Sequence, residues 1–82
     1  MNLTQLYYIR EVADAMSINK AAQKLFMSQS SLSKSIAALE NELETPLLSR
    51  SHSGITLTPY GEYFVAETRD ILDRLDQLTL AA

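Results

Sequence analysis

Apolar residues return every three or four positions over residues 3–15, which is the period of an amphipathic helix. Asn2 precedes this stretch as an N-cap, and Gln5 stands three residues further on, as a capping box requires. The pattern therefore predicts a first helix over residues 3–15. Its core-facing positions are Leu6, Ile9, Val12, Ala13 and Met16.

A second, shorter helix is predicted to begin at a cap, either Ser17 or Asn19, and to run through Leu25. Its inward positions are Ala21, Ala22 and Leu25, and the paired alanines are small enough to let two helices cross closely. Phe26 and Met27 follow in a turn, and we expect both to enter the core.

The third helix, predicted over about residues 28–43, begins at Ser28, a good N-cap residue. Its apolar residues fall on one stripe of about 40° at helical spacing; they are Leu32, Ile36, Leu39 and Leu43. The opposite face carries Ser30, Ser33, Lys34, Ala37 and Asn41. Small polar side chains and one lysine would therefore point away from the core.

Pro46 ends the helical region, and two β-prone stretches, residues 47–50 and 55–58, flank a tip at residues 51–54. This arrangement predicts a β-hairpin. Thr58 and Pro59 are a cap and a first helical residue, so a last helix should run from there towards the C-terminus.

The order of elements predicts a mainly α fold, a winged helix–turn–helix with a three-helix core, a short β-hairpin wing and a long C-terminal helix. We expect residues 1–58 to form the winged helix–turn–helix and residues 59–82 a linker helix for dimerisation. Such a motif presents its second helix at the surface, in a position to enter a DNA major groove.

Composition limits the function classes. The chain has 82 residues, no cysteine and one histidine, so disulfides and thiolate metal sites are excluded. Its N-terminus is amphipathic and carries acids, unlike a signal or transit peptide, and no apolar run approaches membrane-spanning length. We expect a cytoplasmic protein without a membrane segment.

The net charge of −3 at first argues against a polyanionic partner. Residues 1–58 hold five bases and five acids, whereas residues 59–82 hold two bases and five acids. The whole deficit therefore lies in the last helix, and a local basic surface elsewhere can still contact phosphate.

A set of small, apolar and capping residues in register over nearly the whole chain carries a family resemblance. These residues are Leu6, Ile9, Ser17, Ala21, Ala22, Leu25, Ser28, Gln29, Leu32, Ser33, Ile36, Leu39, Glu40, Leu43, Leu47, Arg50, Gly54, Leu57, Thr58 and Gly61. With them the chain resembles the N-terminal DNA-binding domain of LysR-type transcriptional regulators. The resemblance implies sequence-specific binding of double-stranded DNA by a homodimer, with the helix at 28–43 in the major groove, on an interrupted palindrome. Known members continue into a larger effector-binding domain that is absent here, and a full-length protein could form a higher oligomer.

The candidate DNA contacts in the third helix are Ser28, Gln29, Ser30, Ser33 and Lys34. A helix N-terminus suits a phosphate, and Gln29 can both donate to and accept from the edge of adenine. Ser28 is equally well explained as a helix cap alone, and an isolated exposed lysine is usually only solvated. The position of Lys34 opposite the apolar stripe favours a contact.

Arg50 and His52 are the candidates in the hairpin. Arg50 would grip a phosphate; the alternative is an ion pair with Glu40 or Glu42. His52 is alone and cannot make a metal site, and the resemblance implies a weak contact with the minor groove.

Several positions depart from the family pattern. Members often have proline at Ser30, arginine at Lys34 and at Ser53, glycine at Glu44 and phenylalanine at Leu48. Lysine lacks arginine's rigid fork, so guanine discrimination should be softer, and Glu44 should cap the helix less well. These departures lower the expected affinity and leave the fold intact.

The last helix repeats apolar residues with a heptad spacing typical of a coiled-coil seam. The predicted dimerisation residues are Phe64, Thr68, Ile71, Leu75 and Leu78. The alternative is a helix packed only on its own domain, which we expect for Tyr60, Tyr63 and Phe64. In the resembling family this helix pairs antiparallel with its copy.

One histidine, no cysteine and only two glycines argue against an enzyme. We expect no cofactor, no metal, no membrane contact and no small-molecule site in this segment. The competing hypothesis is a winged-helix module that binds another protein and not DNA.

Overall fold

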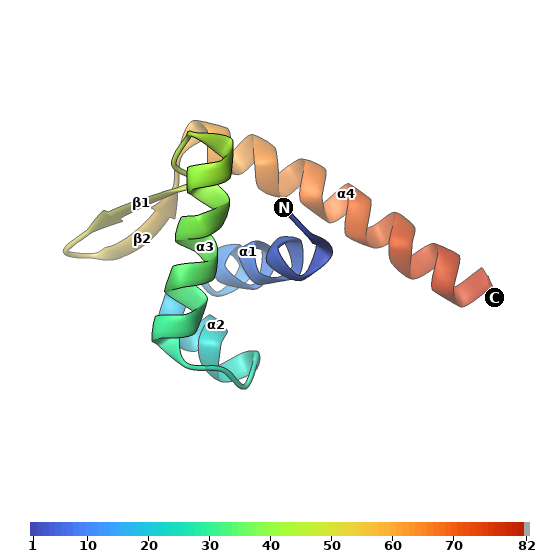
Figure 1. The fold of residues 1–82 in the computed structure, drawn as a ribbon, viewed down its shortest axis with the longest axis horizontal. Coiled ribbons are helices and arrows are strands. Elements are labelled where there is room, and N and C mark those ends of the chain that lie inside the picture. Colours follow the sequence, from blue (N-terminus) through green and yellow to red (C-terminus); the bar gives the residue numbers. More distant parts are fainter. Residues whose placement is uncertain (82) are drawn as a thin grey trace.

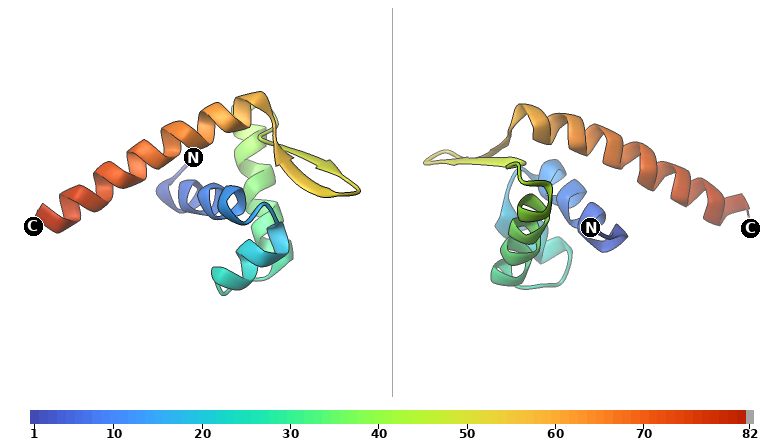
Figure 2. Two further views of the ribbon diagram at one scale, coloured as in Figure 1. Left: turned by 180° about the vertical axis from the view of Figure 1, so that it is seen from behind. Right: turned by 45° about the horizontal axis from the view of Figure 1, so that its top comes forward.

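The computed structural model describes residues 1–81 of the chain, and its elements follow the predicted order (Figure 1). They are α1 (Leu3–Ala15), α2 (Ile18–Lys24), α3 (Gln29–Leu43), β1 (Leu48–Ser51), β2 (Gly54–Leu57) and α4 (Pro59–Ala81). The first three helices form one body, the hairpin of β1 and β2 extends from one side, and α4 extends to the other (Figure 2). The predicted winged helix–turn–helix with a long last helix is confirmed.

Each helix begins at a polar cap that the sequence predicted. Asn2 Oδ1 accepts the Gln5 N–H at 2.8 Å, while Gln5 Oε1 accepts the Asn2 N–H at 3.2 Å, which completes the capping box. Ser17, and not Asn19, caps α2, since its Oγ accepts the Lys20 N–H at 3.1 Å. These bonds satisfy backbone donors that have no partner within the helix.

The core forms where α1, α2 and α3 meet, from the apolar stripes that the helical period predicted. The residues with no exposed surface include Ile9, Val12, Ala21, Leu32, Ile36, Leu39 and Leu47. Leu25 and Leu43 are half-buried and pack against this cluster. Burial of these side chains supplies the main stabilising term of the fold.

Three helices end at a residue other than glycine in the left-handed region. These residues are Met16 (φ 50°), Phe26 (φ 56°) and Glu44 (φ 55°). After α3, the Thr45 N–H donates to the Glu40 carbonyl and the Glu44 N–H to the Asn41 carbonyl, both at 3.2 Å, as in a Schellman motif. A Cβ makes this conformation costly, so the chain carries strain at these ends.

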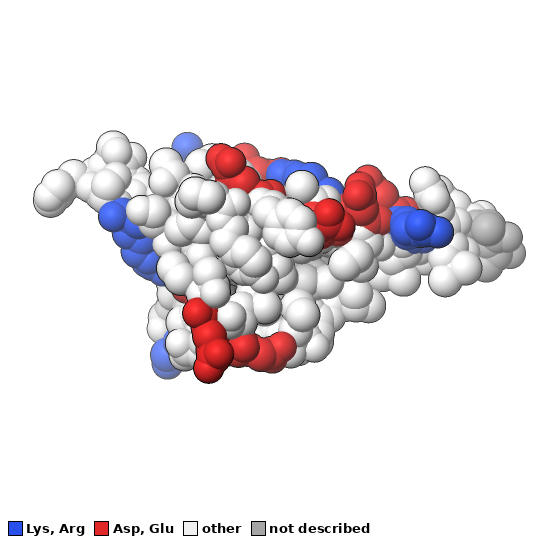
Figure 3. Space-filling view, turned by 90° about the horizontal axis from the view of Figure 1, so that it is seen from above, with Lys and Arg blue, Asp and Glu red and all other residues white. Residues whose placement is uncertain are grey.

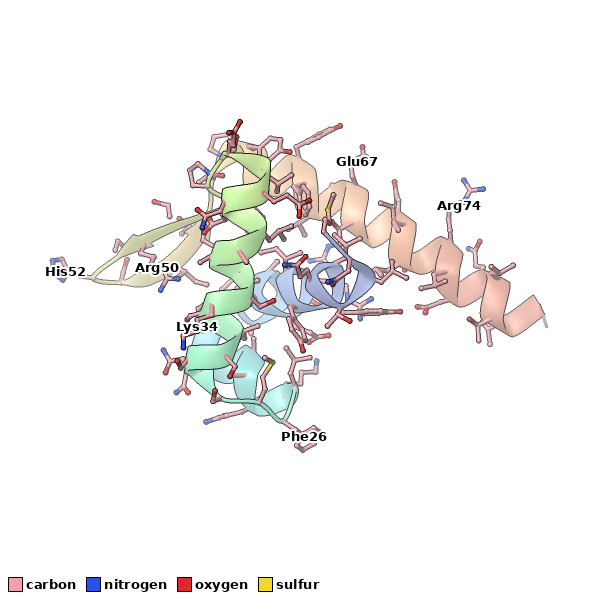
Figure 4. All side chains as sticks on the ribbon, viewed as in Figure 1. Phe26, Lys34, Arg50, His52, Glu67 and Arg74 are labelled. Atoms are coloured by element: carbon pink, nitrogen blue, oxygen red, sulfur yellow. The ribbon has the colours of Figure 1, made fainter. Side chains whose placement is uncertain are left out.

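The left-handed ends overturn two expectations about the core. Met16 is 43% exposed and Phe26 is 97% exposed, because each follows the last turn of its helix and its reversed backbone directs the side chain outward. Of the residues predicted to enter the core from the turn, only Met27 packs against it. The Phe26 side chain points away from the body of the domain (Figure 4).

The N-terminal half of α4 packs on the domain, whereas its C-terminal half extends beyond it (Figure 1). The buried positions are Gly61, Val65, Thr68 and Leu72, and Arg69 Nη2 joins Asp14 Oδ1 of α1 at 2.6 Å. Tyr63 is 60% exposed, so the expectation that it packs on its own domain was wrong. Within residues 1–81, no helix is long and apolar enough to cross a membrane.

Replacing Glu44 with glycine should raise the free energy of unfolding by about 1 kcal/mol, because it removes the Cβ from a left-handed position. Glu44→Ala is the matched control: it removes the same charge but keeps the Cβ, and should recover little of this gain. Thermal and urea unfolding of the two variants measure the difference. An equal effect of alanine and glycine would assign the gain to charge and contradict the strain.

Candidate nucleic-acid interface

The N-terminus of α3 is held by Ser28. Its Oγ accepts the Ser31 N–H at 3.0 Å and donates to Ser31 Oγ at 2.8 Å, so the capping role is confirmed. Gln29 and Ser30 follow in the first turn with exposed side chains. The free N–H groups and the positive end of the helix dipole make this turn favourable for an anion.

The outer face of α3, defined here as Ser30, Lys34, Ala37 and Asn41, is exposed along its whole length. Lys34 points away from the body, to the side on which the hairpin extends (Figure 4). Ser33 differs from its predicted neighbours, because it is half-buried at the border between the core and the outer face. The structure therefore gathers Ser30 and Lys34 on one face and places Gln29 and Ser33 along its flank.

The hairpin is fixed to α3 and α4 through the backbone around Leu47. Glu40 Oε2 accepts the N–H groups of Leu47 and Leu48 at 2.7 and 3.1 Å. The Thr58 N–H donates to the Leu47 carbonyl at 3.0 Å. A Cβ at Gly61 would lie 2.1 Å from that carbonyl oxygen, so only glycine lets α4 begin there. The hairpin thus leaves the domain at a defined angle.

This junction also answers the question of a partner for Arg50. The Glu40 carboxylate accepts hydrogen bonds from the two backbone N–H groups, and the Glu42 carboxylate forms an ion pair with the N-terminal ammonium group. Within residues 1–81, Arg50 takes part in none of the ion pairs. The predicted alternative, an ion pair of Arg50 with Glu40 or Glu42, is therefore not formed, and Arg50 is exposed.

The strand register determines where Arg50 points. Leu48 pairs with Leu57 and Arg50 with Ile55, in antiparallel register. Because side chains alternate between the two faces of a strand, Arg50 shares a face with Leu48, which is buried against the domain. Arg50 therefore lies on the body-facing side of the hairpin, in the same part of the molecule as Lys34 (Figure 4).

The tip of the hairpin is tighter than predicted, because the strands extend to Ser51 and Gly54 and leave His52 and Ser53 between them. Gly54 has φ +121°, a conformation that side chains rarely adopt, and Ser51 Oγ lies 2.9 Å from Ser53 Oγ. His52 is exposed at the far end of the hairpin (Figure 4). Among the described residues, no cluster of three or more metal-ligating side chains exists.

Some of the cations are held in ion pairs and others are not. Arg10 Nη2 and Lys24 Nζ both form ion pairs with the Glu11 carboxylate, at 3.6 and 3.4 Å. No ion pair of the described chain includes Lys34. Lys and Arg side chains lie beside the hairpin and also along α4, while Asp and Glu side chains lie along α4 and in a second group at the lower edge of the view (Figure 3). Lys20 in the first turn of α2 is likewise exposed without an ion pair in residues 1–81. No local signal in the short second helix distinguishes this exposed lysine from any other.

Three helices with a crossing second and third helix, followed by a two-stranded wing, define a winged helix–turn–helix protein. Residues 3–62 match the family described as bacterial regulatory helix-turn-helix proteins of the lysR family. The chain belongs to this family and forms its DNA-binding domain. The predicted resemblance is confirmed.

The relatives are transcriptional regulators. The chain is 41% identical over 78 residues to the uncharacterized HTH-type transcriptional regulator YcgK of Bacillus subtilis, which covers 95% of this chain and 24% of YcgK. It is 40% identical over 82 residues to the Hca operon transcriptional activator HcaR of Escherichia coli, covering 100% of this chain and 28% of HcaR. The chain thus spans about a quarter of the length of these curated relatives.

A crystal structure of the DNA-binding domain of BenM in complex with its catB site 1 DNA has the same fold. It superposes with a TM-score of 0.95 at 36% sequence identity, over 99% of this chain and 91% of that one. The likeness therefore extends over the three-helix body, the hairpin and the long last helix.

Replacing Glu40 with alanine should lower the free energy of unfolding by about 2–3 kcal/mol, because two partly buried N–H groups lose a charged acceptor. Glu42→Ala is the control, since Glu42 is exposed and holds only the chain terminus. Urea unfolding measures the loss, and amide exchange at Leu47 and Leu48 localises it. Equal stability of the two variants would contradict the role given to Glu40.

Proposed function

We propose that this chain binds double-stranded DNA in a sequence-specific manner, as a homodimer, and is the part of a bacterial transcriptional regulator that recognises the operator. The exposed outer face of α3, held beside a fixed hairpin, is the observation that carries the proposal. The BenM domain, which shares the fold, was crystallised on DNA. An α-helix with small side chains on its outer face fits the width of the major groove.

The proposed contacts divide into those that position the domain and those that specify the sequence. Ser28, Gln29 and Ser30 would meet a phosphate at the N-terminus of α3, where the helix dipole attracts an anion. Gln29 would also read adenine, Ser33 a base or phosphate at the edge of the contact, and Lys34 guanine. Arg50 would hold a second phosphate from the hairpin, and His52 would approach the minor groove.

The outer face of α3 and the hairpin carry few cations, so one copy of the domain should bind DNA weakly and a dimer should bind it much more tightly. Two domains on one two-fold axis contact two half-sites one helical turn, or a multiple of it, apart. The acids of α4 lie towards the other end of the molecule from the hairpin (Figure 3), where they would not oppose the phosphates.

The proposed dimer surface is the side of α4 that carries the exposed Ile71 and Leu78 and the half-buried Phe64 and Leu75. Phe64 also packs against the core of its own domain, as expected. Ile71 is 48% exposed and Leu78 is 71% exposed, although both are large and apolar. Thr68 is removed from the predicted set, because it is 2% exposed and faces α1 of its own domain. Apolar side chains at this spacing are typical of helices that pair.

The remaining expectations follow from this role. We infer that the chain has no catalytic activity and uses no cofactor, and that it works in the cytoplasm, where a bacterium keeps its chromosome. The rest of a longer protein would supply any effector response.

Replacing Lys34 or Gln29 with alanine should weaken binding to the preferred operator by about 1–3 kcal/mol, as expected for a residue that reads a base. Lys24→Ala removes the same charge as Lys34→Ala, but from α2, and should have a smaller effect. Binding is measured by fluorescence anisotropy on an operator selected from random DNA. Full affinity and an unchanged preferred site in both variants would show that another face reads the DNA.

The salt dependence of the same binding distinguishes DNA recognition from a protein partner. Each neutralised phosphate should contribute about −0.9 to the slope of log affinity against log salt concentration. No selection of a DNA sequence at low salt would contradict the proposed function and favour the interaction module.

Replacing Leu78 with aspartate should shift the chain from dimer towards monomer in sedimentation equilibrium, because a charge would enter the apolar surface between copies. Thr79→Asp, one position along the same exposed half of α4, is the matched control. An unchanged association constant for Leu78→Asp would mean that the copies meet elsewhere.

A further inference from the structure

Phe26, in the turn between α2 and α3, combines a strained backbone with an almost fully exposed aromatic ring. The Phe26 N–H donates to the Gln23 carbonyl at 3.2 Å. The Met27 N–H donates to the Ala22 carbonyl at 3.0 Å. These two bonds form a Schellman motif, in which Phe26 occupies the left-handed position at φ 56°. Glycine or asparagine is usual there, since a Cβ makes this conformation costly.

The Phe26 ring gains almost nothing within the chain that would offset this cost. Phe26 is 97% exposed, more than any other large apolar residue within residues 1–81. Met27 packs against the core and already supplies the apolar contact that accompanies such a motif. Met16, which has the same left-handed backbone, is 43% exposed, so more than half of its surface is covered. A strained residue whose side chain is left uncovered points to a role outside the fold.

The surroundings of Phe26 favour an anionic partner. No acidic residue occurs between Asp14 and Glu40. The charged residues of this stretch are Lys20, Lys24 and Lys34. Phe26, Lys34 and His52 lie along one edge of the molecule, from the turn past α3 to the tip of the hairpin, and α4 leaves the body on the other side (Figure 4). A duplex that meets Lys34 and the hairpin would therefore also pass the turn.

The position of the turn determines which part of the DNA the ring can reach. Phe26 stands two residues before Ser28, the N-cap of α3, so their Cα atoms are at most about 7 Å apart. A phosphate bound at this N-terminus would belong to a strand at the border of the major groove. The sugar next to that phosphate would lie beside the turn, outside the groove. A flat apolar ring suits the carbon–hydrogen surface of a deoxyribose.

We propose that Phe26 is a further DNA contact of this chain, and that its ring packs against a deoxyribose of the operator backbone next to the phosphate at the N-terminus of α3. The proposal rests on the DNA binding proposed above. It adds a contact that depends on burial of apolar surface and not on charge. The contact is independent of sequence, because every nucleotide of DNA carries the same sugar. It strengthens binding by a surface that has few cations.

Replacing Phe26 with asparagine separates the contact from the strain. Asparagine suits the left-handed backbone, so Phe26→Asn should raise the thermal midpoint of unfolding. Loss of the ring should nevertheless weaken binding about tenfold, on the selected operator and on a duplex of unrelated sequence alike. Phe26→Tyr keeps the ring and should retain the wild-type affinity. Glu44→Asn is the control, because it relieves the same strain at the other end of α3 and should not weaken binding.

The salt dependence of binding identifies the kind of contact. Each phosphate neutralised by a cation contributes about −0.9 to the slope of log affinity against log salt concentration. Phe26→Asn should lower the affinity by the same factor at every salt concentration and leave this slope unchanged. Arg50→Ala, which removes a proposed phosphate contact, should instead make the slope shallower by about 0.9.

The outcomes distinguish this contact from the function on which it rests. A wild-type chain that binds neither duplex at low salt overturns the proposed DNA binding, and the contact with it. If the wild-type chain binds and Phe26→Asn matches it on both duplexes, only the contact is overturned, and the exposed ring would be left for a protein partner. A loss confined to the selected operator would assign the ring to a base and overturn the contact with a sugar. Equal losses in Phe26→Tyr and Phe26→Asn would also overturn it.

Discussion

The arrangement of the whole domain depends on one peptide segment, the backbone around Leu47. Its N–H is bound by Glu40 of α3, its carbonyl accepts the Thr58 N–H before α4, and α4 passes so close that only Gly61 fits. Three elements that serve different purposes are therefore joined at one residue with no exposed surface. Lys34 on α3 and Arg50 on the hairpin keep a constant relation because of this junction, and so does the start of the helix that extends to the other side.

Such rigidity matters for recognition, because contacts that are already in place cost less entropy when the partner binds. The hairpin is only two short strands, which would be marginal alone. Its base is stabilised by a carboxylate from another element and by the burial of Leu48, while its tip, with His52, remains exposed. Because Arg50 lies within β1 and His52 lies at the tip, the position of the Arg50 backbone is fixed more firmly by the strand pairing than that of His52.

Most of the fold could be predicted from the sequence, because helical periods and capping residues are local signals. The errors occurred where the backbone takes a conformation that the residue type does not favour. Met16 and Phe26 occupy left-handed positions where glycine or asparagine is usual, so their side chains were assigned to a core that they leave. Thr68 was assigned to a partner surface, but it is buried against its own domain. The assignment failed because a heptad pattern does not show which side of a helix its own domain covers.

The candidate site could be predicted less completely, since it depends on contacts between distant elements. Lys34 and Ser30 follow from the helical period of α3 alone. The direction of Arg50 requires the strand register, and the role of Glu40 requires the path of the chain around Pro46, neither of which has a local signal. Ser33 is half-buried because it lies at the edge of the apolar stripe. At such an edge, a rotation of a few tens of degrees about the helix axis decides between exposure and burial.

The acidic surface of α4 bears on how such a protein finds its site. A chromosome contains on the order of 10⁶–10⁹ wrong positions, and every cation that contacts a phosphate strengthens all of them equally. In the proposed role, a domain with few free cations and an acidic helix would gain little from the phosphates at these positions. The operator would then face weaker competition from the rest of the chromosome.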